Sequence, residues 1–490
     1  MDELSKRIKL SSGIELDLSN LSLKEVPSVI FELKDLEFIN FGGNKLNSLP
    51  SDIKKLRKLK TLFFANNDFE SVPSVLGDLP ELFMLSFKGN KIKIIDPLSL
   101  SPSIQWLILT DNQITNLPNS IGKLKKLRKL MLSGNKLTSL PEEMQFCRDL
   151  ELIRLSSNNF ENLPSWLTDL PKLAWIAISG NPLTTKDQIY SELQVLSSKE
   201  FTLKEKLGEG TSGVVSRATW NSKDIEVALK MFKSSTTSDG TPQEEIRASL
   251  HVGKHKNTIP TLGAVLDEER QGLIFSLIPK SYKSLGKPPS FKTVTRDVYE
   301  KDTLYSLGDT VEILHGIASI GAHLHQRGLC HGDIYAHNIL VDREMKLPPL
   351  LCDYGAATFY NKLSMNIDLE SVEVRAWGVL ADELLSLPSK DENILAEDNQ
   401  IKAQLIELKD QCLSNTPKNR PRFQEIVDII SSFSILTKKV NKQSGSFLGN
   451  NMSIYHIGGV AITAFCTYLI LRKISGLFRN KSTLISKETW

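Results

Sequence analysis

The stretch HGDIYAHNILVD, residues 331–342, holds side chains at a spacing that suits the transfer of a phosphoryl group. The carboxylate of Asp333 can accept a hydroxyl proton or orient an attacking oxygen, and the amide oxygen of Asn338 can bind a hard cation. A second carboxylate, Asp353, follows in LCDYGAAT. Because Mg²⁺ prefers oxygen ligands and phosphoryl transfer needs mainly positioning and positive charge, these residues form a candidate site.

A glycine-rich stretch upstream suits the binding of phosphates. In LGEGTSGVVSRA, residues 207–218, Gly208, Gly210 and Gly213 let the backbone approach phosphate oxygens closely. Strand-type residues flank the stretch, and VALK follows, ending in Lys230, which can hold those oxygens as a point charge. The two motifs together predict a nucleotide site on a sheet.

The next segment, TPQEEIRASLHVGKHKN, favours a helix that carries a partner for Lys230. Glu244 and Glu245 both lie on it. The spacing to HKN slightly favours Glu245, and both residues remain candidates. Beyond it, GLIFSLIP, residues 272–279, predicts a buried strand that leads into a hinge between two lobes.

Five motifs in this order resemble those of the protein kinase superfamily. They are the glycine-rich stretch, VALK, the loop at 331–342, LCDYGAAT, and CLSNTPKNRPRF at residues 412–423. The resemblance covers about residues 200–436, and its last motif is most similar to the tyrosine-kinase-like branch. An ordered set of five is far more specific than any one of them.

The resemblance implies a bilobal α+β domain that uses ATP and Mg²⁺, and it implies roles for particular residues. The implied catalytic residues are Asp333, Lys230, Glu245 and His337. The implied nucleotide-binding residues are Gly208, Glu209, Gly210, Gly213, Val215, Ala228 and Lys230, with Val215 and Ala228 as small apolar side chains around the adenine ring. The implied metal ligands are Asn338 and Asp353.

The loop departs from the family pattern at its basic residues. Gly332 stands where the family has an Arg that binds a phosphorylated activation loop. The family also has Lys two residues after the catalytic Asp, or Arg four residues after it, and those places hold Tyr335 and His337. A protonated His337 would supply part of the missing charge, or it merely packs. Lower turnover is therefore expected.

The segment after the predicted metal ligand is short. Only 21 residues separate Gly355 from Trp377, and no Ala-Pro-Glu motif follows. In the family, Arg420 would pair with the Glu of that motif. Because an unpaired buried charge is unfavourable, we expect Glu370 or Glu373 to replace it. Glu373 also stands where the family has an Asp that bonds back to the catalytic loop, which would leave Glu370 freer.

Three functions remain open. The first is a Ser/Thr-type protein kinase, on the strength of the retained Lys230, Asp333, Asn338 and Asp353. The second is a catalytically weak pseudokinase that acts as a scaffold, because of the missing cation and the short segment. The third is a small-molecule kinase, since His-Gly-Asp also resembles aminoglycoside and choline kinases, although CLSNTPKNRPRF argues against it.

The N-terminal 183 residues repeat with a period of 23, and one step is 22. The seven Asn positions that mark the period are Asn44, Asn67, Asn90, Asn112, Asn135, Asn158 and Asn181. The pattern L-x-x-L-x-L-x-x-N-x-L resembles the leucine-rich repeat family over about residues 14–183. It predicts an α/β solenoid with apolar positions stacked inside and Asn side chains that bond to backbone groups.

The outward positions of the predicted strands are apolar. They include Phe38, Phe63, Met84, Trp106, Ile108, Met131 and Trp175, and Arg154 and Lys129 lie among them. Exposed apolar surface with Trp and Met often marks an interface, so we expect this concave face to bind a protein substrate or regulator. The second domain of the same chain is another possible occupant. The side chains covering one another remains the alternative.

Composition and the termini set further limits. The net charge of +3 gives no case for a nucleic acid partner, and five widely spaced cysteines argue against disulfides or a zinc site. From Gln443 to Leu471, 29 residues carry no charge, and a basic flank follows. Residues 454–471 are long enough to span a bilayer, with a buried helix as the alternative. They resemble a tail anchor that holds the kinase in the cytosol on an organelle outer membrane or the endoplasmic reticulum.

The predicted organisation is therefore a leucine-rich repeat solenoid, a bilobal kinase-like domain and a single C-terminal transmembrane helix. The domain boundaries that we predict are 1–183 for the repeats, 184–199 for a helical linker, 200–436 for the kinase domain, 437–453 for a second linker, 454–471 for the membrane anchor and 472–490 for a basic tail.

Overall fold

The computed structural model describes most of the chain from Glu3 to Phe433. The exceptions within that range are residues 11–12, 185–194, 211, 234–236, 238, 268–269, 362–364 and 392–395. The predicted linker at 437–453, the span at 454–471 and the basic tail at 472–490 lie outside the described residues. Within the part that is described, no helix is both long and apolar enough to cross a bilayer.

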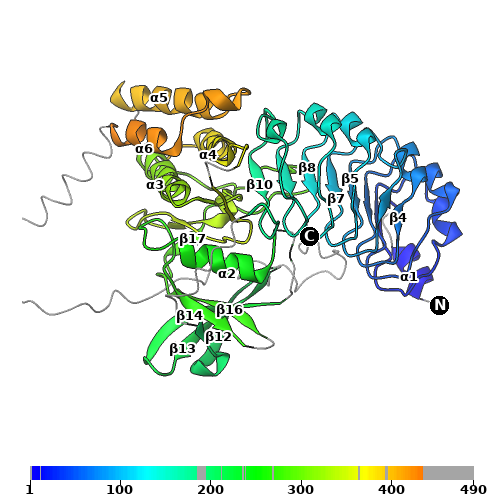
Figure 1. Ribbon diagram of the computed structural model, residues 1–490, viewed down its shortest axis with the longest axis horizontal. Coiled ribbons are helices and arrows are strands. Elements are labelled where there is room, and N and C mark those ends of the chain that lie inside the picture. Colours follow the sequence, from blue (N-terminus) through cyan, green and yellow to red (C-terminus); the bar gives the residue numbers. More distant parts are fainter. Residues whose placement is uncertain are drawn as a thin grey trace, which may run out of the picture.

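The first unit is a solenoid built on one eight-stranded parallel sheet (Figure 1). After helix α1 (Glu3–Leu10), its strands are β1 (Glu15–Asp17), β2 (Phe38–Asn40), β3 (Thr61–Phe63), β5 (Met84–Ser86), β7 (Trp106–Ile108), β8 (Lys129–Met131), β9 (Leu152–Arg154) and β10 (Trp175–Ala177). The 3₁₀ turns η1 (Ser28–Glu32), η2 (Ser51–Lys55), η3 (Ser74–Asp78), η4 (Asn119–Lys123), η5 (Glu142–Phe146) and η6 (Ser165–Leu167) connect them, with β4 (Ser71–Val72) and β6 (Ile94–Ile95) forming a small second sheet.

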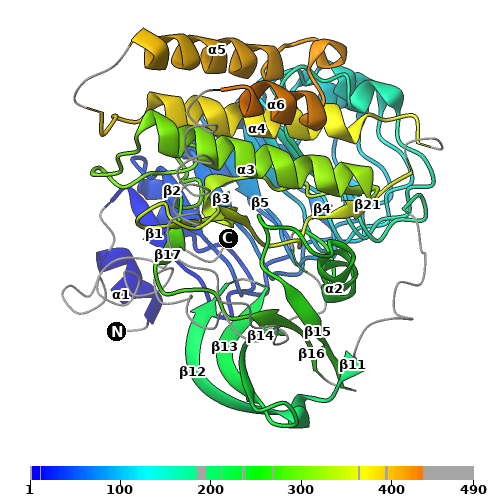
Figure 2. The same cartoon turned by 90° about the vertical axis from the view of Figure 1, so that its left-hand side faces the viewer.

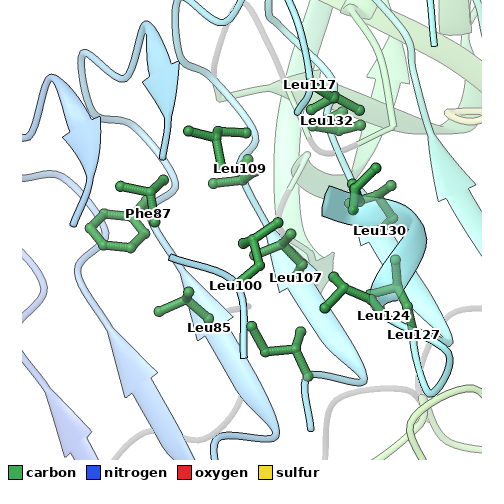
Figure 3. Close-up of a cluster of buried hydrophobic side chains, with 14 of the residues drawn as sticks. Leu85, Phe87, Leu100, Leu107, Leu109, Leu117, Leu124, Leu127, Leu130 and Leu132 are labelled. Atoms are coloured by element: carbon green, nitrogen blue, oxygen red, sulfur yellow. The ribbon is translucent and has the colours of Figure 1, made fainter. Parts of the chain in front are cut away.

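The repeat pattern accounts for this architecture. Leucines of successive strands point into one continuous core, as Leu85, Leu107 and Leu130 do in Figure 3. The predicted role of the seven periodic Asn residues is confirmed. Asn67 is buried, its Nδ2 donates to the carbonyl of Phe41 at 2.9 Å, and its Oδ1 accepts the backbone N–H of Leu46 at 2.9 Å. Each repeat is thereby tied to the one before it.

The second unit begins with a six-stranded sheet in the order β11-β15-β16-β14-β13-β12. The strands are β11 (Val195–Leu196), β12 (Phe201–Glu209), β13 (Gly213–Trp220), β14 (Ile225–Phe232), β15 (Thr261–Leu266) and β16 (Gln271–Ser276), with η8 (Ser198–Glu200) and helix α2 (Pro242–His251). Val195 and Leu196 were predicted to lie in a helical linker. They are instead extended and pair with Ala264 and Val265 at the sheet edge.

The other lobe is mainly helical. Its helices are α3 (Leu307–Gln326), α4 (Leu369–Ser386), α5 (Ala396–Cys412) and α6 (Phe423–Ser431). Its short strands are β17 (Tyr282–Ser284), β18 (Leu329–Cys330), β19 (Ile339–Asp342), β20 (Leu350–Leu351) and β21 (Thr358–Phe359), with the turns η9 (Ala336–Asn338) and η10 (Pro417–Asn419). Figure 2 shows α3 to α6 stacked on one side of this unit and strands β12 to β16 on the other.

The solenoid packs against the helical lobe through its last strands (Figures 1 and 2). Two apolar clusters run across the boundary. Cys330 and Val372 of the second unit belong to the core of the repeats, whereas Leu152 and Trp175 of the repeats belong to the core of the helical lobe. The two units therefore share buried surface, and the concave side of the repeats faces the chain's own second domain.

Candidate active site

The structure selects Glu245 over Glu244 as the partner of Lys230. Helix α2 starts at Thr241, whose side chain accepts the N–H of Glu244, with Pro242 at the first helical position. That start turns Glu245 inward, and its Oε1 lies 2.5 Å from Nζ of Lys230. Glu244 instead pairs with Arg247.

Lys230 is also close to the predicted metal ligand Asp353. The distance from its Nζ to Oδ1 of Asp353 is 4.0 Å. Burial disfavours the charged form of Lys230, but Glu245 and Asp353 outweigh burial and raise its pKa. The charge of Lys230 in turn lowers the pKa of Asp353, whose side chain is half exposed. Both groups are therefore charged at neutral pH, as phosphate and metal binding require.

The glycine-rich stretch is the turn between β12 and β13. Gly210 donates to the carbonyl of Gly213 at 2.9 Å. A Cβ at Gly213 would lie 2.5 Å from the carbonyl oxygen of Met231, so only glycine fits the close approach to β14. Gly208 lies at the end of β12 in register with Val215. Glu209 forms ion pairs with Lys206 and Lys233 on the surface of this turn.

Strand register places the predicted adenine contacts beside Lys230. Val215 is directly opposite Lys230 across the β13–β14 pair, and Ala228 precedes Lys230 by two residues on β14. Opposite residues of an antiparallel pair, and residues two apart on a strand, share a face of the sheet. Val215, Ala228 and Lys230 therefore line the same side.

Residues 331–338 of the predicted catalytic loop lie between β18 and β19. His331 is fully buried, its Nδ1 accepts the N–H of Asp333 at 3.2 Å, and its Nε2 bonds to the carbonyl of Cys352 at 3.2 Å. Asn338 donates to Oδ2 of Asp333 at 2.8 Å. These bonds use the NH₂ group of Asn338, so its amide oxygen can serve as a ligand for a cation. With the carboxylate of Asp353, it makes the oxygen donor set that Mg²⁺ prefers, so the residues fit the implied metal.

Glu373 of α4 accepts hydrogen bonds from the backbone of this loop. Its carboxylate accepts the backbone N–H groups of His331 at 3.2 Å and of Gly332 at 2.6 Å, and it bonds to His325 at 2.7 Å. Burial raises the pKa of Glu373, but the hydrogen bond and charge of His325, together with His331 and the N–H of Gly332, outweigh burial and lower it. The predicted bond from Glu373 back to the catalytic loop is thus present. The thiol of Cys330 also lies 3.4 Å from this carboxylate.

His337 pairs with a buried carboxylate. Its Nδ1 and its backbone N–H each lie 2.8 Å from an oxygen of Asp297. Burial lowers the pKa of His337, but the hydrogen bond and charge of Asp297 outweigh burial and raise it. Tyr335, at the other place where a cation was expected, is buried, and its ring stacks on Trp175 of β10 at 4.2 Å between centroids.

An arginine of the repeats, which no sequence motif indicated, bonds to the carboxylate of Asp333. Arg154 ends β9, its side chain is 3% exposed, and its Nη2 bonds to Oδ1 of Asp333. Its Nη1 donates to the carbonyl of Gly332 at 3.0 Å, and its Nε donates to Asp239 at 2.8 Å. Burial opposes the charge of Arg154, but Asp333 and Asp239 outweigh burial and raise its pKa.

A second repeat cation lies nearby. Lys129 is one repeat earlier, on β8, and its Nζ lies 4.0 Å from the ring centre of Trp106. Burial and the charge of Arg154 lower the pKa of Lys129 to about 8, although Asp333 acts in the opposite direction. In the sequence, Arg154 and Lys129 stand out only as basic residues on an otherwise apolar concave face.

The backbone at Gly332 explains one departure from the family pattern. Gly332 has φ +75°, and a Cβ there would lie 2.4 Å from the carbonyl oxygen of Ile176 in β10 and 2.8 Å from that of Ala356. An arginine at this place would collide with the docked repeats and would adopt a backbone conformation that L side chains rarely take. Glycine is what the close approach of β10 requires.

The apolar concave face is covered by the segment between β17 and α3. Phe63, Met84, Trp106 and Ile108 are buried in one cluster with Val294, and Phe38 and Met131 pack at its edge. Phe291 of the same segment lies 6.2 Å from Phe63 between ring centroids. Trp175 is 1% exposed. The chain's own second domain, one of the possibilities considered from the sequence, therefore packs against this face.

The predicted carboxylate partner of Arg420 is wrong. Arg420 is buried, but it donates to the carbonyl oxygens of Ser371, Ser414 and Pro171 at 2.8 to 3.0 Å. Glu373 is occupied by the catalytic loop, and Glu370 accepts the N–H of Phe423. Burial lowers the pKa of Arg420 to about 9. Three carbonyl dipoles, one of them from the repeats, replace the expected carboxylate.

Comparison with known families agrees with this division. Residues 201–386 match the family model described as protein kinase domain. Residues 102–160 and 125–183 match the leucine rich repeat model. The chain carries leucine-rich repeats followed by a protein kinase domain.

Individual relatives are kinases or repeat proteins. The chain is 28% identical over 186 residues to ribosomal protein S6 kinase alpha-1 of Mus musculus, a stretch that is 36% of this chain and 24% of that protein. It is 26% identical over 286 residues to a probable serine/threonine-protein kinase of Dictyostelium discoideum, covering 51% of this chain and 30% of that one. The chain thus spans less than a third of the length of either curated relative.

Among solved structures, a leucine-rich-repeat protein of Leptospira interrogans is 28% identical, with a TM-score of 0.30, over 36% of this chain and 50% of that chain.

Proposed function

We propose that this protein is an ATP-dependent protein kinase that phosphorylates serine or threonine. The observation that carries the proposal is the Lys230–Glu245 ion pair, buried at 2.5 Å and adjacent to Asp353. A nucleotide-free scaffold has no need to keep a buried lysine charged beside a carboxylate that faces solvent. The similarity to a probable serine/threonine-protein kinase and the closing motif at 412–423, similar to the tyrosine-kinase-like branch, support the same class.

The chemistry follows from the roles of the residues. The hydroxyl oxygen of the substrate attacks the γ-phosphorus of ATP, and the new O–P bond forms as the bond from that phosphorus to the β–γ bridging oxygen breaks. ADP leaves with the electron pair of the broken bond. Asp333 accepts the hydroxyl proton, and His331 fixes the loop that presents Asp333. Lys230 binds phosphate oxygens of the nucleotide.

The metal residues fit magnesium. Asn338 and Asp353 would hold Mg²⁺, which when bound neutralises charge on the phosphates. The protein contribution is to hold both donors rigidly. Asn338 is fixed by its bonds to Asp333, and Asp353 has φ +62°, a conformation that the surrounding loop must impose on a non-glycine residue.

A catalytically weak scaffold is the second candidate. It is favoured by the cover over the loop, where the side chain of Asp333 is 18% exposed and Tyr335 lies under Trp175. A small-molecule kinase, the third possibility, would also tolerate a covered loop. A scaffold would transfer no phosphate from ATP, whereas a small-molecule kinase would transfer it to a metabolite.

The experiment is a transfer assay with γ-labelled ATP and Mg²⁺ on the purified chain, a generic protein and a metabolite panel. The proposal expects label on serine or threonine of a protein, and loss of label in Lys230→Met. Label on a metabolite alone identifies a small-molecule kinase. ATP binding without transfer identifies a scaffold.

We further propose that residues 454–471 tether the kinase to an organelle outer membrane or the endoplasmic reticulum, on the strength of the charge-free run and its basic flank. Deleting residues 450–490 is expected to release the protein from the membrane fraction of cells. An unchanged membrane fraction would contradict the anchor. A substrate or regulator that uses the concave residues of the repeats would have to compete with the kinase domain that now covers them.

A further inference from the structure

We propose that the repeat array completes the kinase active site by supplying Arg154 as the cation that the catalytic loop lacks. The inference rests on the proposed kinase activity and adds a residue from outside the kinase domain to it. It makes the leucine-rich repeats a working part of the enzyme and not solely a recruiting surface.

The contacts of Arg154 place its charge beside the carboxylate of Asp333, the proposed proton acceptor. Its guanidinium bonds to the carboxylate of Asp333 and to the carbonyl of the neighbouring Gly332, while Asp239 fixes Nε from the other side. A guanidinium held on three sides is rigid, and its rigid planar fork of donors suits phosphate oxygens. The side chain is 3% exposed, so water screens this charge little.

The loop residues that depart from the family pattern are those that lie against the docked repeats. Tyr335 stands where the family has a lysine, and its ring is stacked under Trp175 of β10. The Nε1 of Trp175 also donates to the carbonyl of Ile334 at 2.9 Å. Gly332 leaves room for the carbonyl of Ile176. The basic side chains are therefore missing at the places where strand β10 lies, while strand β9 delivers a basic side chain to the same carboxylate.

Other contacts hold Arg154 in register with the loop. Glu151, the residue before β9, is buried, bonds to Arg296 at 3.1 Å and accepts a bond from the hydroxyl of Thr295. Val294, which precedes Thr295, packs on the concave face. Its φ of +61° is unfavourable for a β-branched residue. The buried contact must compensate for that strain. The docked arrangement is thus specified at several points around Arg154.

Arg154 and Asp333 both keep hydrogen-bonding capacity for this role. A guanidinium has five N–H groups, and the three bonds above use one each on Nε, Nη1 and Nη2. The second N–H on Nη1 and on Nη2 is the donor that we assign to the transferring phosphoryl group. Asp333 has about four lone-pair sites, of which Arg154 and Asn338 take one each, so it can still accept the substrate proton.

The test compares full-length variants in the steady state with ATP, Mg²⁺ and the protein substrate found for the wild type. Arg154→Gln should lower kcat by about 10²-fold or more, since arginine fingers contribute about 10³ to 10⁵ in related phosphoryl transfers. The KM for ATP should stay within about threefold, because the contacts that we assign to ATP binding, those of Lys230, remain. Arg154→Lys should retain more activity than Arg154→Gln.

Two controls separate catalysis from folding. Arg148→Gln removes an exposed arginine of the same repeat region and should leave kcat unchanged. Adding guanidinium ion at non-denaturing concentration to Arg154→Ala should restore part of kcat, which a merely structural loss would not allow. Rescue, together with an unchanged KM for ATP, supports the proposal.

The outcomes that overturn it are distinct. An Arg154→Gln enzyme as fast as the wild type, or faster, would mean that Arg154 is idle or that the docked repeats inhibit. A loss of kcat with no guanidinium rescue, and no advantage for Arg154→Lys, would make Arg154 a packing residue. A wild-type protein that transfers no phosphate to a protein would instead remove the proposed function, and the inference with it.

Discussion

The indole of Trp175 and the phenol ring of Tyr335 stack with 7° between their planes, joining the last full repeat to the catalytic loop. Both residues are almost fully buried. Trp175→Ala should destabilise the docked arrangement by about 3 to 5 kcal/mol, because it removes a large buried aromatic group. Hydrogen exchange of peptides covering residues 329–338 should become faster.

Trp175→Phe is the matched control for this stack. It keeps an aromatic ring on Tyr335 and removes the N–H that bonds to the carbonyl of Ile334. It should cost about 1 kcal/mol, the usual contribution of one hydrogen bond. If the alanine variant exchanges no faster than the wild type, the repeats do not cover the catalytic loop in solution.

Gly332→Ala should be far more damaging than an alanine at another left-handed glycine. Both Gly332 and Gly13 have positive φ, +75° and +77°, so alanine strains the backbone by about 1 to 2 kcal/mol at either site. At Gly13 the new Cβ would meet nothing within 4 Å, whereas at Gly332 it would lie 2.4 Å from a backbone oxygen of Ile176. Thermal unfolding of the two variants measures the difference. Equal losses would show that β10 does not approach Gly332.

His337 should make stability depend on pH in a particular direction. Asp297 raises the pKa of His337 above its usual 6.5 despite burial. A raised pKa means that the charged form stabilises the fold fully below pH 6.5 and that this contribution is lost as the pH rises through the raised value. His337→Gln should therefore destabilise the protein more at pH 6 than at pH 9, measured as the free energy of unfolding.

His315 should make stability depend on pH in the opposite direction. Burial lowers its pKa below 6.5, so its neutral form is favoured in the fold and protonation destabilises it as the pH falls. His315→Gln should become relatively more favourable at low pH. A His337→Gln effect that runs parallel to that of His315→Gln would exclude the Asp297 pair as its cause.

Glu373→Gln should loosen the catalytic loop. The carboxylate accepts two backbone N–H groups and bonds to His325, all buried. Gln keeps the shape but turns one acceptor into an NH₂ donor that faces a donor, so about 3 kcal/mol of stability should be lost. Glu407→Gln, on the exposed side of α5, should change stability by less than about 0.5 kcal/mol. Equal effects of the two changes would contradict the assigned support.

Local patterns predicted the two units and the helix that carries the partner of Lys230. The 23-residue period implied the solenoid and its Asn bonds, and motif order implied the two lobes. The sequence left Glu244 and Glu245 open because both lie on the first turn of one helix, and only the three-dimensional start at Thr241 decides between them. The bond from Glu373 to the loop was also foreseen from its position.

The particular residue pairs between the two units could not be predicted from local patterns. Arg154 and Asp333 are 179 residues apart, and no periodicity reports such a pairing. The signals were present as anomalies: an apolar concave face, a glycine and a tyrosine in place of basic residues, and an arginine among hydrophobic neighbours. The predicted carboxylate partner of Arg420 was wrong for the same reason. One of its actual partners, the carbonyl of Pro171, comes from the repeats.

The measurement that tests the central claim most directly is the single-turnover rate of phosphate transfer from ATP·Mg²⁺ to protein, in the wild type and in Asp333→Asn. If Asp333 accepts the proton of the attacking hydroxyl, the rate should fall by about 10² to 10⁴, with ATP affinity within about threefold. An equal rate in both proteins, or no protein phosphorylation by the wild type, would contradict the account.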